Sequence, residues 1–427
     1  MNKKNFQITT QPPPGTRDFL PADAGLFTRT ADILLREYAG WGYRRVITPS
    51  IEFLDVFSNL KVNGLFKVVD INSGELISFR SDFTPQIARL SSAIMHSRTL
   101  PFKFSYFGPV LRNLDPGSGK PREIWQVGVE LIGPYAPESD AELIVMGIES
   151  LNGLNFRDFN IDVGNVEFFR GIVENIKEND RKKIEECVAR KDSSGLKLIL
   201  EDMSVDDKKK ETIKDLPLLF GEKSIIKKAW KMADNDRSKR ALEDLERVLN
   251  YVKLYKKEKY ITIDLGEIRG LNYYTGTIFE CFIPHIGHEI FGGGRYNNLT
   301  GMFGPSCGGA GFAVDLETVT RHMGEYRYPS EDYLIANVTG NHSFSVEINI
   351  FLRRKGFKVE VSFMDYSYLD FIEYMKQNDI KNIVYIFNDK KSSKGSPLIS
   401  FKKISEEKEN IFRSIPEFKE FIVHMGS

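Results

Sequence analysis

The most informative stretch of the sequence reads Ile263-Asp264-Leu265-Gly266-Glu267-Ile268-Arg269-Gly270-Leu271-Asn272-Tyr273-Tyr274-Thr275-Gly276-Thr277-Ile278-Phe279-Glu280. Two β-prone runs, at 261–265 and 277–282, flank glycines, one arginine and two adjacent tyrosines. Glycine lets the backbone approach a ligand closely, a guanidinium group offers five fixed donors, and tyrosine adds a flat wall with a polar tip. The stretch predicts a pocket for a small polar, partly aromatic ligand. A tight hairpin with both tyrosines in the core and Arg269 in a surface salt bridge would explain the same residues.

The composition is that of a soluble globular protein. The 427 residues are 41% hydrophobic and 28% charged, and this length predicts about two to three domains. Lys plus Arg and Asp plus Glu both number 59, so the formal net charge is zero. Because proteins that grip a polyanion usually carry a basic excess, this neutrality argues against a tRNA partner.

Cysteine usage and hydropathy indicate a cytoplasmic protein. Cys187, Cys281 and Cys307 are scattered without a CxxC spacing, which indicates reduced thiols rather than a disulfide frame or a zinc site. No run approaches the ~18 apolar residues of a membrane-spanning helix, and the N-terminus lacks the apolar core of a signal peptide. His285 and His288 share a loop, but no third ligand stands at a known metal spacing, so neither a metal nor a cofactor is expected.

Several blocks of the sequence resemble one superfamily. Residues 269–280 resemble the histidine-specific motif of histidyl-tRNA synthetases, and also the matching stretch of the synthetase-like regulatory subunit of ATP phosphoribosyltransferase. An expected helix at 22–38, followed by a strand that ends in Pro49, resembles motif 1, the dimer-forming element of class II synthetases. The entry segment, motif 2, the Gly-Gly-Arg-Tyr strand and motif 3 of the family have counterparts at 15–21, 103–133, 291–297 and 308–323.

The resemblance implies an α+β fold of the class II aminoacyl-tRNA synthetase type, in which an antiparallel sheet is flanked by helices. It places a histidine-binding domain at 1–325, with a helical insertion at about 165–258 whose charged runs are expected to be solvated. Strand and helix patterns alternate from 333 to 404, which predicts a C-terminal α/β domain at 331–427.

The resemblance also assigns a set of histidine-binding residues. Asp82 and Thr84 fall on the carboxylate and hydroxyl positions that hold the amino group of histidine, although Asp82 would serve equally as the N-cap of a helix expected at 85–95. Gln126 and Glu130 are four residues apart and share one face of a strand, where buried polar groups need partners. The complete set that the resemblance implies is Asp82, Thr84, Arg112, Gln126, Glu130, Arg269, Tyr273 and Tyr274.

The ATP side of the site departs from the synthetase pattern. Motif 3 of synthetases ends in Gly-Leu-Glu-Arg, whereas this chain has Asp315-Leu316-Glu317-Thr318, and Leu114 replaces the motif 2 glutamate that meets adenine. An aspartate at 315 would face the triphosphate, and two like charges ~4 Å apart at an effective dielectric constant of ~20 repel by roughly 4 kcal/mol. Arg321 lies three residues after Thr318, and a shift of helix register would let it replace the missing arginine.

A site that keeps the histidine-binding positions but has lost the ATP-binding positions is typical of a sensor. The resemblance then implies a non-catalytic regulatory subunit of ATP phosphoribosyltransferase, a glycosyltransferase complex, that binds L-histidine for feedback control of the first step of histidine biosynthesis and lacks aminoacylation activity. The implied partner is the short-form catalytic subunit, in a hetero-oligomer built on dimers of this chain, with no tRNA and no membrane. An active histidyl-tRNA synthetase, an aminoacyl-tRNA ligase, is the alternative that the extra C-terminal domain favours. A synthetase-derived stress sensor or binding module is a third class.

Overall fold

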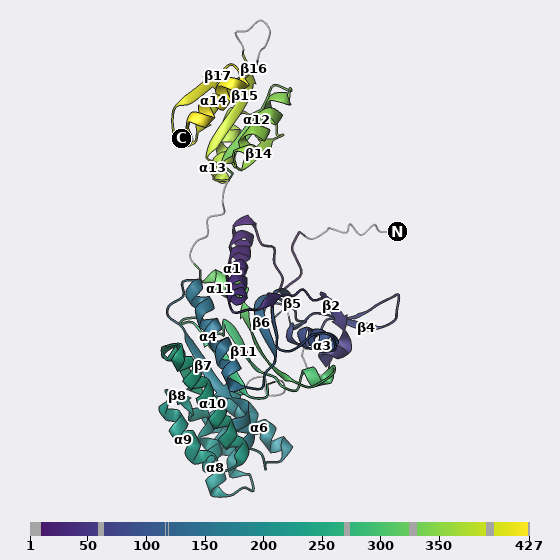
Figure 1. Cartoon of the computed structure of the whole chain (residues 1–427), viewed down its shortest axis with the longest axis vertical. Coiled ribbons are helices and arrows are strands. Elements are labelled where there is room, and N and C mark those ends of the chain that lie inside the picture. The colour runs from purple at the N-terminus through teal and green to yellow at the C-terminus, as the bar shows by residue number, and fades with distance from the viewer. Residues whose placement is uncertain are drawn as a thin grey trace. The chain divides into compact units, whose positions relative to one another are not determined.

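The structure is a computed structural model that describes residues 10–58, 64–115, 117, 119–268, 274–323, 331–389 and 397–425. The chain divides into two units, residues 1–326 and residues 327–427 (Figure 1). None of the helices within the described ranges has both the length and the apolar character that a membrane crossing requires.

A nine-stranded sheet is the centre of the first unit, counted over the described residues. From one edge to the other its strands are β1 (Arg44–Arg45), β5 (Phe102–Leu111), β6 (Glu123–Gly133), β12 (Gly308–Asp315), β11 (Phe291–Arg295), β10 (Thr277–Phe282), β7 (Asn160–Asn165), β9 (Ile261–Asp264) and β8 (Phe220–Gly221). All pairs from β5 to β7 are antiparallel, which confirms the predicted central sheet. The pairs β1–β5 and β7–β9 are parallel, because long connections rather than hairpins join these strands.

The stretch around 263–280 does not form a hairpin. Strands β9 and β10 both pair with β7 and lie on its two opposite edges. The hairpin interpretation is therefore wrong, because a strand from much earlier in the chain separates the two β-prone runs. Strand β10 is held in the middle of the sheet, beside the glycine-rich strand β11.

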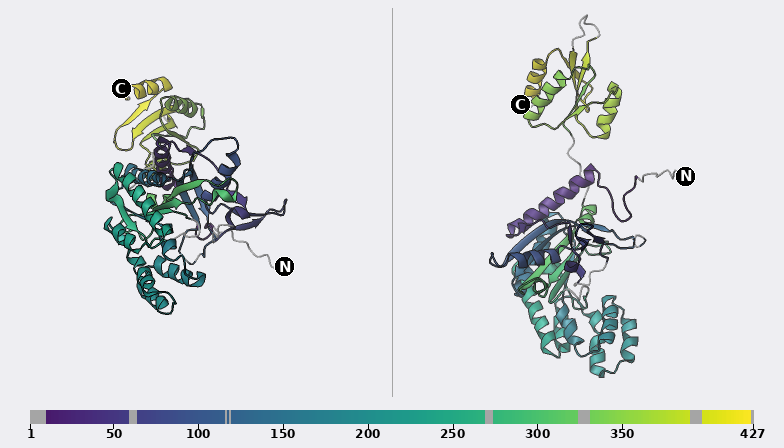
Figure 2. Two further views of the ribbon diagram at one scale, coloured as in Figure 1. Left: turned by 60° about the horizontal axis from the view of Figure 1, so that its bottom comes forward. Right: turned by 90° about the vertical axis from the view of Figure 1, so that its right-hand side faces the viewer.

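Helices α1 (Pro21–Gly40) and α4 (Pro137–Gly153) pack on this sheet and on each other (Figures 1 and 2). The apolar residues of α1 recur at helical spacing and form one buried stripe. They are Phe27, Ala31, Leu34 and Tyr38. Gly42 follows the helix with a φ of +86°, a conformation that glycine adopts without steric cost, so the chain turns there into β1.

A smaller sheet and two helices supply the first residues of the site. Three strands pair in the order β2 (Ile51–Phe53), β4 (Leu76–Phe79) and β3 (Lys67–Val69). Helix α2 (Leu54–Ser58) follows β2, and α3 (Thr84–Ile94) follows β4. Asp82 and Thr84 therefore lie where the chain leaves β4 and starts α3. A third short helix, α11 (Leu316–Arg321), begins at the end of β12.

A helical insertion follows β7. Its helices are α5 (Val166–Ile172), α6 (Glu178–Ala189), α7 (Ser193–Glu201), α8 (Asp207–Lys214), α9 (Ser224–Met232) and α10 (Asp236–Leu254). Short 3₁₀ turns lie at Leu216–Leu218, Glu258–Tyr260 and, outside the insertion, Thr300–Met302. Side chains of Asn165, Asp192, Asp206 and Asn235 accept backbone N–H groups at the starts of α5, α7, α8 and α10, as good N-cap residues do.

The second unit is a small α/β domain, as predicted. Its sheet has the order β14 (Val359–Ser362), β13 (Tyr333–Asn337), β15 (Asn382–Asn388), β16 (Pro397–Lys403) and β17 (Glu409–Phe412). Alternate residues of β13 pack on opposite faces, one covered by α12 (Ser343–Arg354) and α14 (Ile415–Met425) and the other by α13 (Tyr368–Gln377). Strand β17 and helix α14 extend the alternation beyond the predicted strand at 398–404.

Candidate functional site

A cavity of about 290 Å³ opens on the large sheet, where β5, β6, β12, β11 and β10 lie side by side. Six of the predicted histidine-binding residues line it together. They are Asp82, Thr84, Arg112, Gln126, Glu130 and Tyr274. Arg269 and Tyr273 lie outside the described residues. The sequence positions of the six span almost two hundred residues, so the fold is what brings them into one pocket.

Glu130 is the most buried of these polar groups, with 1% of its surface exposed. It lies on β6 directly opposite Gly311 of β12, and a Cβ atom at position 311 would collide with its carboxylate. The Thr84 hydroxyl donates to Oε1 at 2.5 Å, and the Tyr296 hydroxyl donates to Oε2. Burial raises the pKa of Glu130 to about 8, although these hydrogen bonds oppose the rise. A cation placed beside this carboxyl group would favour its charged form, so the group is suited to receive one.

Asp82 lies one residue before the N-cap of α3, which is Phe83, so the prediction that Asp82 is itself the N-cap is wrong. The Asp82 side chain nevertheless contacts the start of the helix. Its Oδ1 atom accepts the backbone N–H of Thr84 at 2.9 Å, so it satisfies an orphan donor at the start of α3. The same carboxylate lines the cavity. Burial raises the pKa of Asp82, while the Thr84 N–H and the positive charge of Arg112 act in the opposite direction. The Asp82 carboxylate can therefore accept the N–H group at the start of α3 and can also pair with an ammonium group in the cavity.

Several further residues line the pocket that were not predicted from the sequence. They are the tyrosines Tyr106 and Tyr296, and the polar residues Glu280, His288 and Glu289. Strand alternation could have found Glu280, because Ile278 and Glu280 share one face of β10. Tyr106 stacks on Phe83 with ring centroids 4.1 Å apart, and burial raises the pKa of Tyr106. No such signal marks Tyr296, whose partner Glu130 is remote in sequence.

The loop with two histidines does not form a metal centre within the described parts of the chain. His288 Nε2 lies 3.1 Å from the Thr318 hydroxyl, which ties this loop to α11. No group of three His, Cys, Asp or Glu side chains that could hold a metal ion occurs in those parts.

The end of the pocket near α11 lacks the arginine of synthetases. Asp315 lines the cavity and is the N-cap of α11, where it accepts the backbone N–H groups of Glu317 at 3.0 Å and Thr318 at 3.1 Å. Arg321 is 60% exposed, forms an ion pair with Glu317, and does not line the cavity. Glu317 also lies 3.2 Å from Arg17. Arg321 therefore points along the outer surface of α11 and does not take the place of the missing arginine.

Comparisons with known proteins identify the family of the chain. A family model described as histidyl-tRNA synthetase matches residues 15–319. The ATP phosphoribosyltransferase regulatory subunit of Geobacter sulfurreducens is 36% identical over 388 residues, which are 88% of this chain and 88% of that protein. The protein of the same name from Syntrophotalea carbinolica is 39% identical over 322 residues, which are 74% and 75% of the two chains.

Solved structures show the same fold at lower identity. A crystal structure of an ATP phosphoribosyltransferase regulatory subunit/histidyl-tRNA synthetase from Bacillus halodurans has a TM-score of 0.79 and 24% identity, and covers 88% of this chain and 98% of that one. Histidyl-tRNA synthetase from Nostoc sp. PCC 7120 has a TM-score of 0.76 and 22% identity, with coverage of 98% and 100%. The class II synthetase-like fold is thereby confirmed. The chain belongs to the family of ATP phosphoribosyltransferase regulatory subunits, and its histidyl-tRNA synthetase-like part spans residues 15–319.

Proposed function

We propose that this chain senses L-histidine as the non-catalytic regulatory subunit of ATP phosphoribosyltransferase, and that it has no aminoacylation activity. The observation that carries the proposal is the lining of one pocket. It holds the polar residues that an α-amino acid requires, and it adds the carboxylates Glu280, Glu289 and Asp315, which do not suit a triphosphate. The regulatory role of the relatives, as their names state it, supports the same function.

Free histidine matches the charges of six candidate residues that line the pocket. Arg112 would receive the carboxylate, and Asp82 together with Glu130 would receive the ammonium group. Tyr274 offers a flat wall to the imidazole ring, and Gln126 offers it a hydrogen-bonding group. An ammonium group beside Glu130 favours the charged carboxylate, so binding would lower the pKa of that residue.

The remaining carboxylates of the pocket disfavour ATP. Glu280, Glu289 and Asp315 line the cavity, whereas Arg112 is the one arginine or lysine among its described lining residues. Each carboxylate placed ~4 Å from a phosphate charge, at an effective dielectric constant of ~20, would cost roughly 4 kcal/mol. This electrostatic repulsion, together with the outward direction of Arg321, argues for an amino-acid sensor rather than for an active synthetase.

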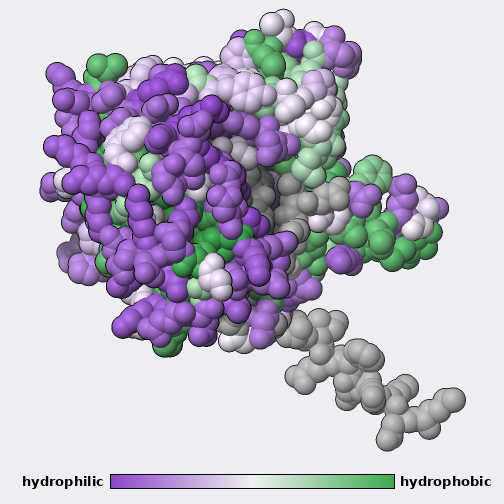
Figure 3. Space-filling view, turned by 90° about the horizontal axis from the view of Figure 1, so that it is seen from below, coloured by the Kyte–Doolittle hydropathy of each residue, from purple (hydrophilic) through white to green (hydrophobic). Residues whose placement is uncertain are grey.

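Self-association as dimers, and assembly with the short-form catalytic subunit, complete the proposal. The small sheet and the chain leading into it expose large apolar side chains, which favours burial against another subunit. These residues are Ile47, Ile51, Phe53, Val69, Ile71 and Leu76. Figure 3 shows apolar surface on the projecting hairpin of β3 and β4.

The test of the proposed function is catalysis by the short subunit, measured with and without this chain and titrated with histidine. We expect the chain to raise activity and histidine to suppress it, with the suppression weakened in Asp82→Asn. Asp158→Asn is the matched control, because Asp158 is exposed and lies outside the pocket. Equal activity of the short subunit alone, or unchanged inhibition in Asp82→Asn, would contradict the proposal.

A further inference from the structure

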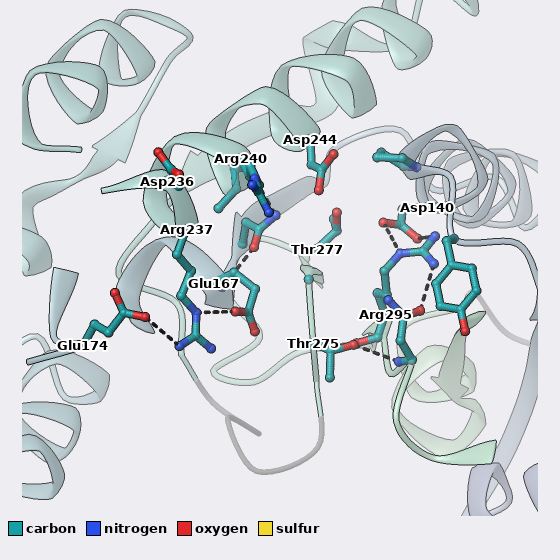
Figure 4. Close-up of a pocket in the computed structure, with 16 residues that line it drawn as sticks. Asp140, Glu167, Glu174, Asp236, Arg237, Arg240, Asp244, Thr275, Thr277 and Arg295 are labelled. Atoms are coloured by element: carbon teal, nitrogen blue, oxygen red, sulfur yellow. Dashed lines mark hydrogen bonds and ion pairs between the residues drawn. The ribbon is translucent and has the colours of Figure 1, made fainter. Parts of the chain in front are cut away.

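A second and larger cavity, of about 610 Å³, lies between the helical insertion and the large sheet (Figure 4). Helix α10 forms one wall with Arg240 and Asp244, and the start of β10 and the end of β11 form another with Thr277 and Arg295. The cavity lining includes Thr275 and Thr277 of the stretch 269–280 and Arg295 of the strand at 291–297, but none of the six described candidates for histidine binding lines it. Its volume lies within the range of roughly 300–1,000 Å³ that is usual for small-molecule sites.

Two arginines, each paired with carboxylates, build the walls of this cavity. Arg295, which is 4% exposed, donates from Nε to Asp140 at 3.0 Å and from a terminal nitrogen to the other oxygen of Asp140. Arg237 donates to Glu167 at 2.6 Å and reaches Glu174 at 3.8 Å. Figure 4 shows these pairs on either side of a central space. These arginines and carboxylates neutralise one another within the protein, and the ion pairs stabilise the two walls of the cavity.

The charges that remain for a ligand are of both signs and lie on α10, where Asp236, Arg240 and Asp244 line the cavity at intervals of four residues. Arg240 and Asp244 are four residues apart, so they are neighbours on one face of the helix. Arg240 is exposed and forms no ion pair within the described parts of the chain. Asp244 pairs with Arg247 at 3.8 Å, and Arg247 is held by a closer pair with Glu138. An anion alone would pair with the Arg240 guanidinium and leave the Asp244 carboxylate without a close partner, and a cation alone would do the reverse. A ligand that carries both charges would pair with both side chains.

We propose that this cavity is a second, effector site that binds a small zwitterion, with a carboxylate on Arg240 and an ammonium group on Asp244. Free amino acids and dipeptides share this chemistry. Polar groups at the bottom of the cavity would orient the rest of the ligand, because Thr277 and Asn165 line it and are almost fully buried.

The second cavity and the histidine pocket share a wall, so a ligand in one could affect binding in the other. This effector role rests on the proposed function, because it requires histidine to bind in the first pocket. Tyr274 lines the histidine pocket and the next residue, Thr275, lines the second cavity. Arg295 lines the second cavity and the next residue, Tyr296, hydrogen-bonds Glu130 in the histidine pocket. The two segments are joined, since the Thr275 N–H donates to the Arg295 carbonyl at 2.7 Å. A displacement on one side of this wall must move residues on the other.

Calorimetric titration of the full chain with the standard amino acids and with a set of dipeptides tests the site. At least one zwitterion should bind, and its affinity should fall about tenfold or more in Arg240→Gln and in Asp244→Asn. The matched controls are Lys239→Gln and Glu243→Gln, exposed neighbours on α10 that do not line the cavity, and these should bind as the wild type does. Saturation with the zwitterion should change the affinity for histidine about fivefold or more.

Three outcomes would overturn the inference. The site is refuted if no zwitterion binds, or if Arg240→Gln and Asp244→Asn bind as tightly as the controls. It is also refuted if all binding is lost in Asp82→Asn, because the zwitterion would then occupy the histidine pocket. Unchanged histidine affinity at saturation would refute the effector role. Failure of histidine itself to bind would be seen in its own titration, and would count against the proposed function instead.

Discussion

The buried carboxyl group of Glu130 makes the stability of the first unit depend on pH. Its pKa rises from an ordinary value of 4.5 to about 8 in the folded chain, mainly through burial. Between these two values the folded state holds a proton that the unfolded state has released. The stabilisation is fully present below pH 4.5 and is lost as the pH rises through about 8. Replacement by glutamine keeps the shape and removes the titration.

The size of this effect follows from the two pKa values. Each pH unit between them is worth about 1.36 kcal/mol, and they differ by about 3.5 units, so the full effect is roughly 5 kcal/mol. A glutamine side chain at position 130 can still accept from Thr84, because its amide oxygen can take the place of Oε1. The unfolding free energy of the wild type should therefore fall relative to Glu130→Gln by about 1.4 kcal/mol per pH unit from pH ~5 to pH ~8.

Urea unfolding followed by tryptophan fluorescence measures this difference. The three tryptophans, Trp41, Trp125 and Trp230, all lie in the first unit, so the signal does not report the second unit. Glu75→Gln is the control, because Glu75 is exposed in the turn between β3 and β4 and its replacement should reproduce the wild-type pH profile. A stability difference between wild type and Glu130→Gln that stays constant over this pH range would refute the account of Glu130 as a buried carboxyl group.

Three further outcomes are expected. Histidine-dependent pyrophosphate exchange should be undetectable, and exchange that disappears in Arg321→Ala would show that this arginine serves ATP after all. Histidine at ~100 times its dissociation constant should stabilise the chain by about 2.7 kcal/mol, seen as a higher melting temperature, and Arg112→Ala should reduce this rise at the same concentration. Gly311→Ala should lower the unfolding free energy by about 1–3 kcal/mol in the same urea assay, because the new methyl group would collide with Glu130; unchanged stability would show that the strand can shift.

Much of the site was predictable because its residues sit in local patterns. Gln126 and Glu130 share a strand face by simple alternation, and both line the cavity. Asp82 and Thr84 stand at the start of a helix, where short polar side chains hydrogen-bond free backbone N–H groups. The resemblance to synthetases then joined these separate patterns into one set.

The unpredicted features depend on strand register, which no local pattern contains. Glu130 faces Gly311 and receives the Tyr296 hydroxyl only because β6, β12 and β11 are neighbours in one register. The insertion of β7 between β9 and β10 has the same origin, since two β-prone runs close in sequence predict a hairpin just as well. The direction of Arg321 was left open by sequence spacing, and the contact with Glu317 decides it.

The two changes at motif 3 support each other structurally. Asp315 accepts the N–H groups of Glu317 and Thr318, and the Thr318 hydroxyl donates to its second oxygen at 3.0 Å. An N-cap of this kind is typically worth about 1 kcal/mol, so the pair stabilises the start of α11. Restoring an arginine at 318 alone would remove one of these bonds and leave the aspartate facing the pocket. We therefore infer that a change at 318 alone would not restore ATP binding, which supports the proposal that the pocket serves an amino acid.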